Sequence, residues 1–266
     1  MGYREELILG DPDYKWSFSR IKKFNECAYG WYIKYIEDCD TEDLFFSQFG
    51  SFVHNIFAAV LLGNLPIQDV LTHYLVNFRT KVNAKPPSES ILAAYFQDGL
   101  RVAKNIESFI SLFDNYEIVG VELPLEFQIK SKYNFVGFID LLLKDKNGNY
   151  IIVDHKSRKL KPRSKKGNTK SDRELDDYFK QLYLYGNAVK EMYGRYPTEL
   201  WLNCFRNKDS LIKEVFDNAR NEMVTDWIVG LIEEIKSNNE WKPNCDWFAC
   251  TNLCECCHSC EYYQLM

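Results

Sequence analysis

The spacing of hydrophobic residues changes from a helical to an alternating period near residue 115 and returns to a helical period near residue 172. Apolar residues recur every three or four positions in four N-terminal segments, which predicts helices over 17–36, 45–62, 67–83 and 90–114. Alternation then predicts strands, over 116–130, 133–157 (as a hairpin), 198–206 and 210–216. Further helices are expected over 172–196 and 217–238. Helices before and after a central set of strands predict an α/β or α+β fold, and we expect the α/β class.

Local signals refine three of these elements. Asn147-Gly148 lies between two apolar runs, and this pair favours a tight hairpin turn because glycine readily adopts positive φ. Pro124 lies within the first strand and predicts an edge strand or a bulge, since proline cannot donate a backbone hydrogen bond. Asp172 is a plausible cap for the helix that follows it.

The hairpin turn predicts a register with chemical consequences. If Lys146-Asn147-Gly148 is a three-residue loop, Asp145 pairs with Asn149, and counting outward sets Asp140 opposite Asp154. Side chains alternate along a strand, so Asp154 and Lys156 share a face while His155 points to the other. The sequence therefore predicts two carboxylates and a lysine on one patch.

Such a patch is typical of phosphodiester hydrolysis. Two neighbouring carboxylates repel each other unless a cation or a proton offsets their charge. A small number of oxygen ligands from the protein suits Mg²⁺ or Mn²⁺. A nearby lysine can orient or activate water, or stabilise the charge on phosphorus. A single aspartate near a strand end usually caps a turn, but Asp140, Asp154 and Lys156 together favour a site.

Composition narrows the class of protein. The chain has 266 residues, 46% of them hydrophobic and 15% aromatic, which is enough for a sizeable core and excludes a disordered protein. The hydrophobic runs are too short to span a membrane. The first residues carry several charges, so we expect no signal peptide and an intracellular protein. A net charge of −5 argues against a uniformly basic surface.

Cysteine is concentrated at the C-terminal end. Nine cysteines occur in the chain, and six of them lie after residue 244. An odd number of clustered cysteines in a reducing compartment favours metal ligation over a disulfide framework. The tail is therefore expected to bind a metal.

The segment IDLLLKDKNGNYIIVDHKS resembles the core of the PD-(D/E)XK nuclease superfamily, with Asp140, Asp154 and Lys156 at its motif positions. Three further segments resemble the RecB-like branch and its iron–sulfur exonucleases, including CRISPR-associated and AddB-type relatives. They are FGSFVHNIF, QLYLY and SFSRIKKFNECAYGWYIKYI. The resemblance spans residues 17–260 and implies a central mixed sheet flanked by helices, with an N-terminal helical region and a Cys-rich iron–sulfur tail.

The resemblance also implies roles for individual residues. It makes His54 a ligand of the divalent cation beside Asp140 and Asp154, and His155 a ligand through its backbone carbonyl. It places Gln181 and Tyr185 next to Lys156 or the DNA. The chain departs from the usual pattern at His155, where relatives often have an aromatic residue, and at Ala28, where they commonly have proline. Glu122 is expected to be structural.

In this branch one upstream and three C-terminal cysteines hold a [4Fe–4S] cluster. The best match here is Cys27 with Cys250, Cys254 and Cys260, although the first gap in the tail is one residue longer than usual. Cys256 and Cys257 are rival ligands. Four thiolates also suit Zn²⁺, so a zinc site remains the alternative.

A basic loop follows directly after Lys156 and is a candidate for phosphate contact. The residues expected to bind DNA are Arg158, Lys159, Lys161, Arg163, Lys165 and Lys166, with Arg20 near the cluster.

The sequence as a whole predicts a single RecB-like nuclease domain over 1–266. It would comprise a helical part (17–115), a nuclease core (116–216) and a helix with the metal-binding tail (217–266). The expected activity is Mg²⁺- or Mn²⁺-dependent hydrolysis of single-stranded DNA or DNA ends in recombination, repair or CRISPR adaptation, with recombination or CRISPR-integration proteins as partners. Two alternatives are a DNA-binding module with little catalysis and a structural protein with a zinc-binding tail.

Overall fold

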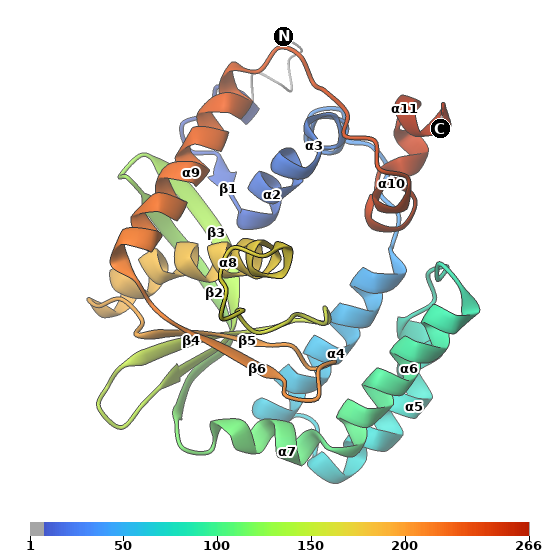
Figure 1. The fold of residues 1–266 in the computed structure, drawn as a ribbon, viewed down its shortest axis with the longest axis vertical. Helices are drawn as coiled ribbons and strands as arrows, with labels where there is room; N and C mark the ends of the chain where they lie inside the picture. The colour runs from blue at the N-terminus through green and yellow to red at the C-terminus, as the bar shows by residue number, and fades with distance from the viewer. Residues whose placement is uncertain (1–7, 266) are drawn as a thin grey trace. The chain divides into compact units, whose positions relative to one another are not determined.

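The computed structural model describes residues 8–265, which form two compact units (Figure 1). The central unit contains Phe45–Pro124 and Phe138–Asp217. The terminal unit contains the described residues up to Leu44 together with Leu125–Gly137 and the chain from Asn218 onwards. Each unit is built from segments that are distant in the sequence. The single domain expected from the sequence stays a prediction.

Mixed strand pairing organises the sheet of the central unit. The strands are β2 (Glu117–Ile129), β3 (Tyr133–Lys144), β4 (Tyr150–His155), β5 (Glu199–Asn203) and β6 (Leu211–Val215). They follow the order β3-β4-β5-β6, and β2 pairs with β3. The β4–β5 pair is parallel, while β3–β4 and β5–β6 are antiparallel. The predicted α/β class and mixed sheet are therefore confirmed, and β2 and β3 contribute residues to both units.

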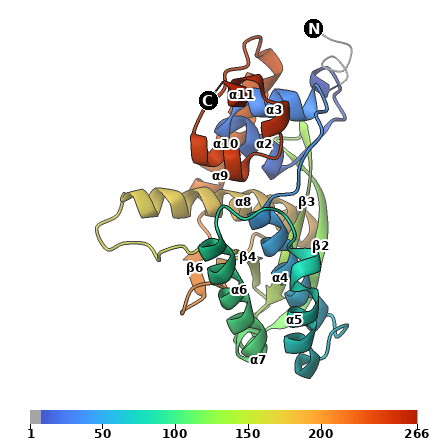
Figure 2. The ribbon, with the colours of Figure 1, turned by 90° about the vertical axis from the view of Figure 1, so that its right-hand side faces the viewer.

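Helices cover this sheet and supply most of the aromatic core. The helices of the central unit are α4 (Phe45–Leu61), η1 (Ile67–Asp69), α5 (Val70–Lys81), α6 (Glu89–Lys104), α7 (Ile106–Ile110), η2 (Ser111–Phe113) and α8 (Lys170–Tyr193). Phe49, Phe57, Tyr74 and Phe205 are fully buried where α4, α5 and α6 pack together. Helix α8 packs against β4 and β5. Helices α4 and α8 both lie beside the sheet (Figures 1 and 2).

The start of α8 differs from the expectation. Thr169, not Asp172, is the N-cap, and its hydroxyl accepts a hydrogen bond from the Asp172 backbone N–H. Asp172 is the third helical residue, and its carboxylate accepts from the backbone and side chains of Ser164 and Thr169. The reciprocal bonds of this capping box satisfy more donors than a single aspartate cap would. They also close the loop 164–169, which extends away from α6 in Figure 2.

The terminal unit is built around α2 (Phe18–Glu26), α3 (Ala28–Tyr35) and α9 (Asn218–Ser237). Strand β1 (Lys15–Trp16) pairs in parallel with the first residues of β3, and the tail forms α10 (Trp247–Leu253), η3 (Cys257–Ser259) and α11 (Glu261–Gln264). The single helix expected over 17–36 is two helices, because Cys27 adopts an extended conformation with φ −161° and caps the second helix with its sulfur. Trp31 is fully buried and stacks on Trp241 at 5.4 Å.

The helices among residues 8–265 include no membrane-span candidate, as none combines the required length with sufficient hydrophobicity.

Candidate active site

The β3–β4 hairpin has the predicted register. Leu141 pairs with Val153 and the Asp145 N–H donates to the Asn149 carbonyl at 2.9 Å, so extending the ladder by one residue sets Asp140 opposite Asp154. The ladder holds because apolar residues of both strands are fully buried and a one-residue shift would expose them. The two carboxylates are therefore brought to one end of the hairpin by backbone pairing.

Asp154 and Lys156 form a buried ion pair. Lys156 Nζ lies 2.7 Å from Asp154 Oδ2, and both side chains are largely buried. Burial raises the pKa of Asp154, opposed by the Lys156 ammonium and reinforced by the Asp140 carboxylate. Burial also acts to lower the pKa of Lys156, but attraction to Asp154 and Asp140 outweighs it, so this pKa is raised. The lysine is thus a protonated group fixed beside two carboxylates.

Helix α8 supports Lys156 through two side chains of one face. Lys156 Nζ donates to Gln181 Oε1 at 3.2 Å, and Gln181 Nε2 donates to the Tyr185 hydroxyl at 3.2 Å. One helical turn separates Gln181 from Tyr185, which allows both to reach the same site. Burial raises the pKa of Tyr185, so its hydroxyl keeps its proton at neutral pH. The structure therefore brings together Lys156, Gln181 and Tyr185 as the sequence predicts.

Helix α4 brings His54 to the first carboxylate. His54 Nδ1 lies 3.4 Å from Asp140 Oδ2. Gly50, one turn earlier, lies against the segment after Lys156, and a Cβ added there would lie only 3.3 Å from Ser157 Oγ. The glycine thus permits the close approach of α4 to this segment, which explains the spacing of Gly50 and His54 in physical terms.

His155 points to the opposite face from Lys156 and is buried. Its ring stacks on Phe57 at 4.7 Å, and its Nδ1 lies 2.9 Å from Asn203 Nδ2. Burial lowers its pKa to about 3, so the ring is neutral at pH 7. The His155 backbone N–H donates to Asp140 Oδ2 at 2.7 Å and holds that carboxylate in place. Metal binding by the backbone carbonyl stays a prediction.

Glu122 also lies in the site, although the sequence predicts a structural role for it. One donor atom each from His54, Glu122 and Asp140 lie within 4.8 Å of one another. Although Glu122 is exposed, partial desolvation of its carboxyl raises its pKa, and the nearby Asp140 adds to this effect while His54 opposes it. Pro124, which predicted an irregular strand, was the only sequence signal near it.

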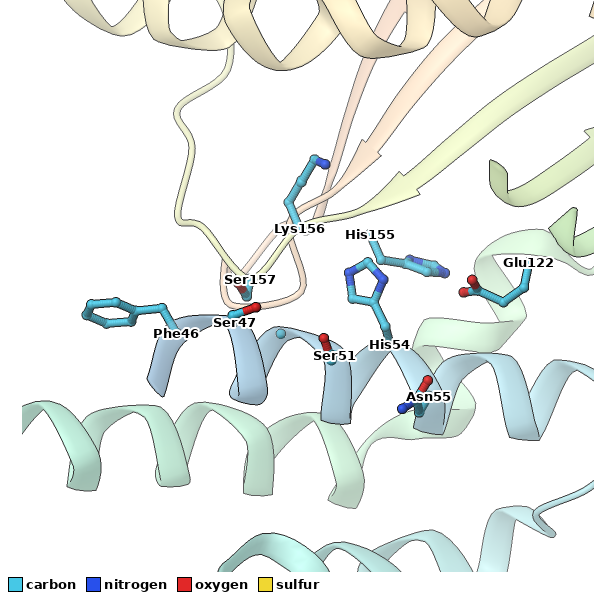
Figure 3. Close-up of a pocket in the computed structure, with 10 residues that line it drawn as sticks. Phe46, Ser47, Ser51, His54, Asn55, Glu122, His155, Lys156 and Ser157 are labelled. Carbon is cyan, nitrogen blue, oxygen red and sulfur yellow. The ribbon is translucent and has the colours of Figure 1, made fainter. Parts of the chain in front are cut away.

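These side chains line a pocket of about 360 Å³ (Figure 3). Its walls come from α4, from β2 and from the end of β4, and the lining residues are Phe46, Ser47, Gly50, Ser51, His54, Asn55, Glu122, His155, Lys156 and Ser157. In Figure 3 the histidine and glutamate side chains lie close together, and Lys156 points away from them.

The donor set fits a hard divalent cation. An imidazole nitrogen and carboxylate oxygens suit Mn²⁺, and carboxylates with water suit Mg²⁺. His54, Glu122 and Asp140 are the side chains whose donor atoms already converge. Asp154 is paired with Lys156 and is not one of these three residues.

Half of the predicted DNA-binding residues of the basic loop are paired with carboxylates. Arg158 lies 2.8 Å from Glu174 and Lys159 lies 3.2 Å from Asp98. Arg163 pairs with acidic residues of α8 and β6. Among the described residues no ion pair holds the other three loop lysines, which are Lys161, Lys165 and Lys166.

Arg20, the remaining candidate, lies in the terminal unit and is engaged locally. Its guanidinium donates to the Lys15 carbonyl and lies over the rings of Tyr14 and Tyr35, 5.0 and 5.5 Å from their centroids.

All nine cysteines are free thiols, and eight of them lie in the terminal unit. Cys27 Sγ accepts backbone N–H bonds from Gly30 at 3.2 Å and Asn244 at 3.4 Å. Burial raises the pKa of Cys260, and repulsion from Cys254 and Cys27 acts in the same direction.

The remaining tail cysteines also act on one another's pKa values. Burial raises the pKa of Cys250, with added repulsion from Cys254 and Cys260. Cys256 forms a hydrogen bond with Cys39, and the charge of Cys254 acts on Cys256 as well as on Cys257. The four predicted cluster ligands therefore interact electrostatically, and through Cys254 the two rival cysteines take part in the same interactions.

The mixed sheet and a carboxylate–lysine site at the end of its hairpin define a nuclease. Residues 15–265 match the PD-(D/E)XK nuclease superfamily, so the chain belongs to this superfamily. No curated protein matches the chain.

One solved structure shows a similar fold, and a second matches at a lower TM-score. A structure named "Putative exonuclease" from Eubacterium rectale is similar over 97% of this chain and 92% of that chain, with 12% identity and a TM-score of 0.57. A protein named SSO0001 is 19% identical over 80% of this chain and 96% of its own, but its TM-score of 0.36 is too low to bear on the fold.

Proposed function

We propose that the protein is a Mg²⁺- or Mn²⁺-dependent DNA exonuclease that acts on single-stranded DNA or on DNA ends. The observation that carries the proposal is the Asp154–Lys156–Gln181 arrangement, with Nζ 2.7 Å from one oxygen and 3.2 Å from the other. A fixed ammonium beside carboxylates is suited to stabilise the negative charge that develops on a phosphodiester during hydrolysis.

In this proposal the cation is held by His54, Asp140 and Asp154, with the carbonyl of His155. When bound, it supplies Lewis-acid polarisation of the phosphodiester and activates water. Lys156 orients the attacking water and offsets charge on the phosphate. Gln181 accepts a hydrogen bond from the Lys156 ammonium and donates one to Tyr185, so the ammonium is held in place before the reaction.

The decisive experiment compares wild type with Lys156→Ala on end-labelled single-stranded DNA in Mg²⁺ and in Mn²⁺. We expect the variant to lose about 10²–10³-fold in kcat. Lys146→Ala, in the hairpin turn, is the matched control and should cleave normally. Equal cleavage by wild type and Lys156→Ala would contradict the mechanism, and binding without cleavage in either metal would favour a DNA-binding module.

We further propose that Lys161, Lys165 and Lys166 contact DNA phosphates. They are free of intramolecular ion pairs among the described residues, and they follow Lys156 in the chain. Arg158, Lys159 and Arg163 would contribute only by exchanging a carboxylate for a phosphate, since each already has a partner.

We also propose that Cys27, Cys250, Cys254 and Cys260 hold a [4Fe–4S] cluster. The two backbone N–H bonds to Cys27 Sγ and the 3.4 Å hydrogen bond from Lys23 Nζ to Cys254 Sγ favour thiolates at these positions.

Iron, sulfide and zinc analysis of anaerobically purified protein tests the cluster. Cys254→Ser should lose iron, whereas Cys256→Ser should retain it. Stoichiometric zinc without iron would contradict the cluster and support the zinc alternative.

A further inference from the structure

Glu122 adopts a backbone conformation that is unfavourable for glutamate. Its φ is +49°, in the left-handed region, although it lies within strand β2. A non-glycine residue in this region is strained, and such strain concentrates at functional sites. The strand continues on both sides, so the irregular residue changes the direction of the Glu122 side chain without ending the strand.

The carboxylate of Glu122 is directed towards His54 and Asp140 but has no partner of its own. One carboxylate oxygen of Glu122 lies within 4.8 Å of a ring nitrogen of His54 and of a carboxylate oxygen of Asp140. Among residues 8–265 no hydrogen bond or ion pair engages the Glu122 carboxylate. A second carboxylate beside Asp140 is unfavourable unless a positive charge lies between them.

A second observation concerns His155, whose ring lies beside that of His54. His155 is 2% exposed, and its Nε2 is buried with no hydrogen-bond partner among the described residues. With Asn203 Nδ2 as donor to Nδ1, Nε2 carries the ring proton. Figure 3 shows the distal edge of this ring directed towards the Glu122 carboxylate. A buried donor without an acceptor is rare and costly, so an acceptor is expected there.

We propose that Glu122 is a further ligand of the divalent cation and that the Nε2–H of His155 positions its carboxylate. This inference rests on the proposed function, since it concerns the same metal centre. One oxygen of Glu122 faces the cation between His54 and Asp140, and the other accepts from His155. A hydrogen bond of this kind orients a ligating carboxylate and strengthens metal binding.

Glu122 changes the composition of the centre. With it, one nitrogen and two carboxylate oxygens from three different elements, α4, β2 and β3, reach the cation in addition to Asp154 and the His155 carbonyl. Asp154 Oδ2 can remain paired with Lys156 at 2.7 Å while the other oxygen of this carboxylate faces the cation. The remaining coordination position is open to a phosphate oxygen or to water.

The test measures Mn²⁺ binding by electron paramagnetic resonance of the free ion, in the absence of DNA. We expect Glu122→Gln to bind Mn²⁺ at least tenfold more weakly than wild type. Glu117→Gln is the matched control, since Glu117 lies in the same strand but pairs with Lys144 at 3.2 Å. It should bind as wild type does.

His155→Phe isolates the positioning role, because phenylalanine preserves the stack on Phe57 but removes the Nε2 donor. We expect about tenfold weaker Mn²⁺ binding by the folded variant, and a lower melting temperature in EDTA, because the buried bond to Asn203 Nδ2 is lost as well. Unchanged Mn²⁺ affinity of the folded variant would show that His155 is only structural and would overturn the positioning role.

The outcomes separate this inference from the proposed function. Wild-type affinity in a folded Glu122→Gln variant, together with loss of cleavage in Lys156→Ala, would overturn the role of Glu122 and leave the nuclease proposal standing. A wild-type protein without a Mn²⁺ site would overturn both. Melting in EDTA shows that Glu122→Gln is folded, which we expect because the Glu122 side chain makes no bond to lose.

Discussion

The buried Asp154–Lys156 pair allows a quantitative prediction. Replacing Lys156 by methionine retains most of the side-chain volume and removes the ammonium. Asp154 Oδ2 then loses the charge that lies 2.7 Å away, while Asp140 remains nearby. Asp154 is only 6% exposed, so water cannot replace the lost partner.

Two opposing effects set the size of the loss in folding stability. At an effective dielectric constant near 20, unit charges at the separation of this pair attract by about 6 kcal/mol. Much of this is offset by the cost of burying both charges, so the net loss on removing one partner of a buried pair is about 3–5 kcal/mol. Protonation of Asp154 limits the loss, because a neutral carboxyl no longer needs the ammonium.

This limit gives the variant a characteristic pH dependence. The unfolded chain releases the Asp154 proton near pH 3.8, whereas the folded variant retains it to higher pH because burial raises the pKa. Stability is therefore greatest below the unfolded value and falls as pH rises towards the folded pKa. In that window the slope approaches about 1.4 kcal/mol per pH unit.

Urea unfolding in EDTA, followed by circular dichroism between pH 5 and 8, measures these effects. We expect Lys156→Met to lose stability with rising pH more steeply than wild type, and Lys146→Met, the exposed control, to follow wild type. The double variant Asp154→Asn/Lys156→Met should be more stable at pH 7 than the sum of the single changes, by about 2 kcal/mol. Additive single changes, or equal pH slopes in Lys156→Met and wild type, would refute the buried pair.

Three further predictions concern other parts of the central unit. Gly50→Ala places a methyl group 3.3 Å from Ser157 Oγ, so we expect roughly tenfold lower kcat/KM in a DNA cleavage assay with little change in melting temperature, and normal activity would contradict this packing. Thr169→Ala removes the helix cap and should cost about 1 kcal/mol in urea unfolding, whereas Thr169→Ser should cost little. Lys165→Ala/Lys166→Ala should reduce the slope of log affinity for single-stranded DNA against log salt by about 1.4 in fluorescence anisotropy, and an unchanged slope would exclude these phosphate contacts.

Local sequence signals were sufficient to predict the register of the hairpin. The turn at Asn147-Gly148 and the buried alternation of both strands leave only one register that hides the apolar face, so the pairing of Asp140 with Asp154 could be predicted. The helical contributions of His54 and Gln181 were predicted from family resemblance, since helical spacing alone does not show which neighbours a side chain meets.

Features that depend on distant partners could not be predicted. Arg163 is the clearest case, because its carboxylate partners Asp176 and Glu214 lie in α8 and β6, and nothing in the loop itself signals either contact. Glu122 was missed for a related reason. Its approach to His54 requires a positive φ that glutamate does not favour, and only the neighbouring Pro124 hinted at irregular backbone.

The structure also separates two carboxylates that the sequence presents as equivalent. Asp140 accepts from the His155 backbone and faces His54 of α4, whereas Asp154 is paired with Lys156, which Gln181 of α8 holds from the other side. In Figure 3, Lys156 points away from the helix that carries His54.

The end of the hairpin is thus in contact with two helices, α4, which precedes it in the chain, and α8, which follows it. A cation at Asp140 and the Lys156 ammonium at Asp154 offset the negative charges of the two carboxylates. The two acids can therefore lie side by side at the end of the hairpin despite their mutual repulsion. Because Asp154 is shared between the ammonium and the cation, ligands from elements other than β4 strengthen the metal site. Helix α4 supplies His54, and the strained residue of β2 supplies a further carboxylate.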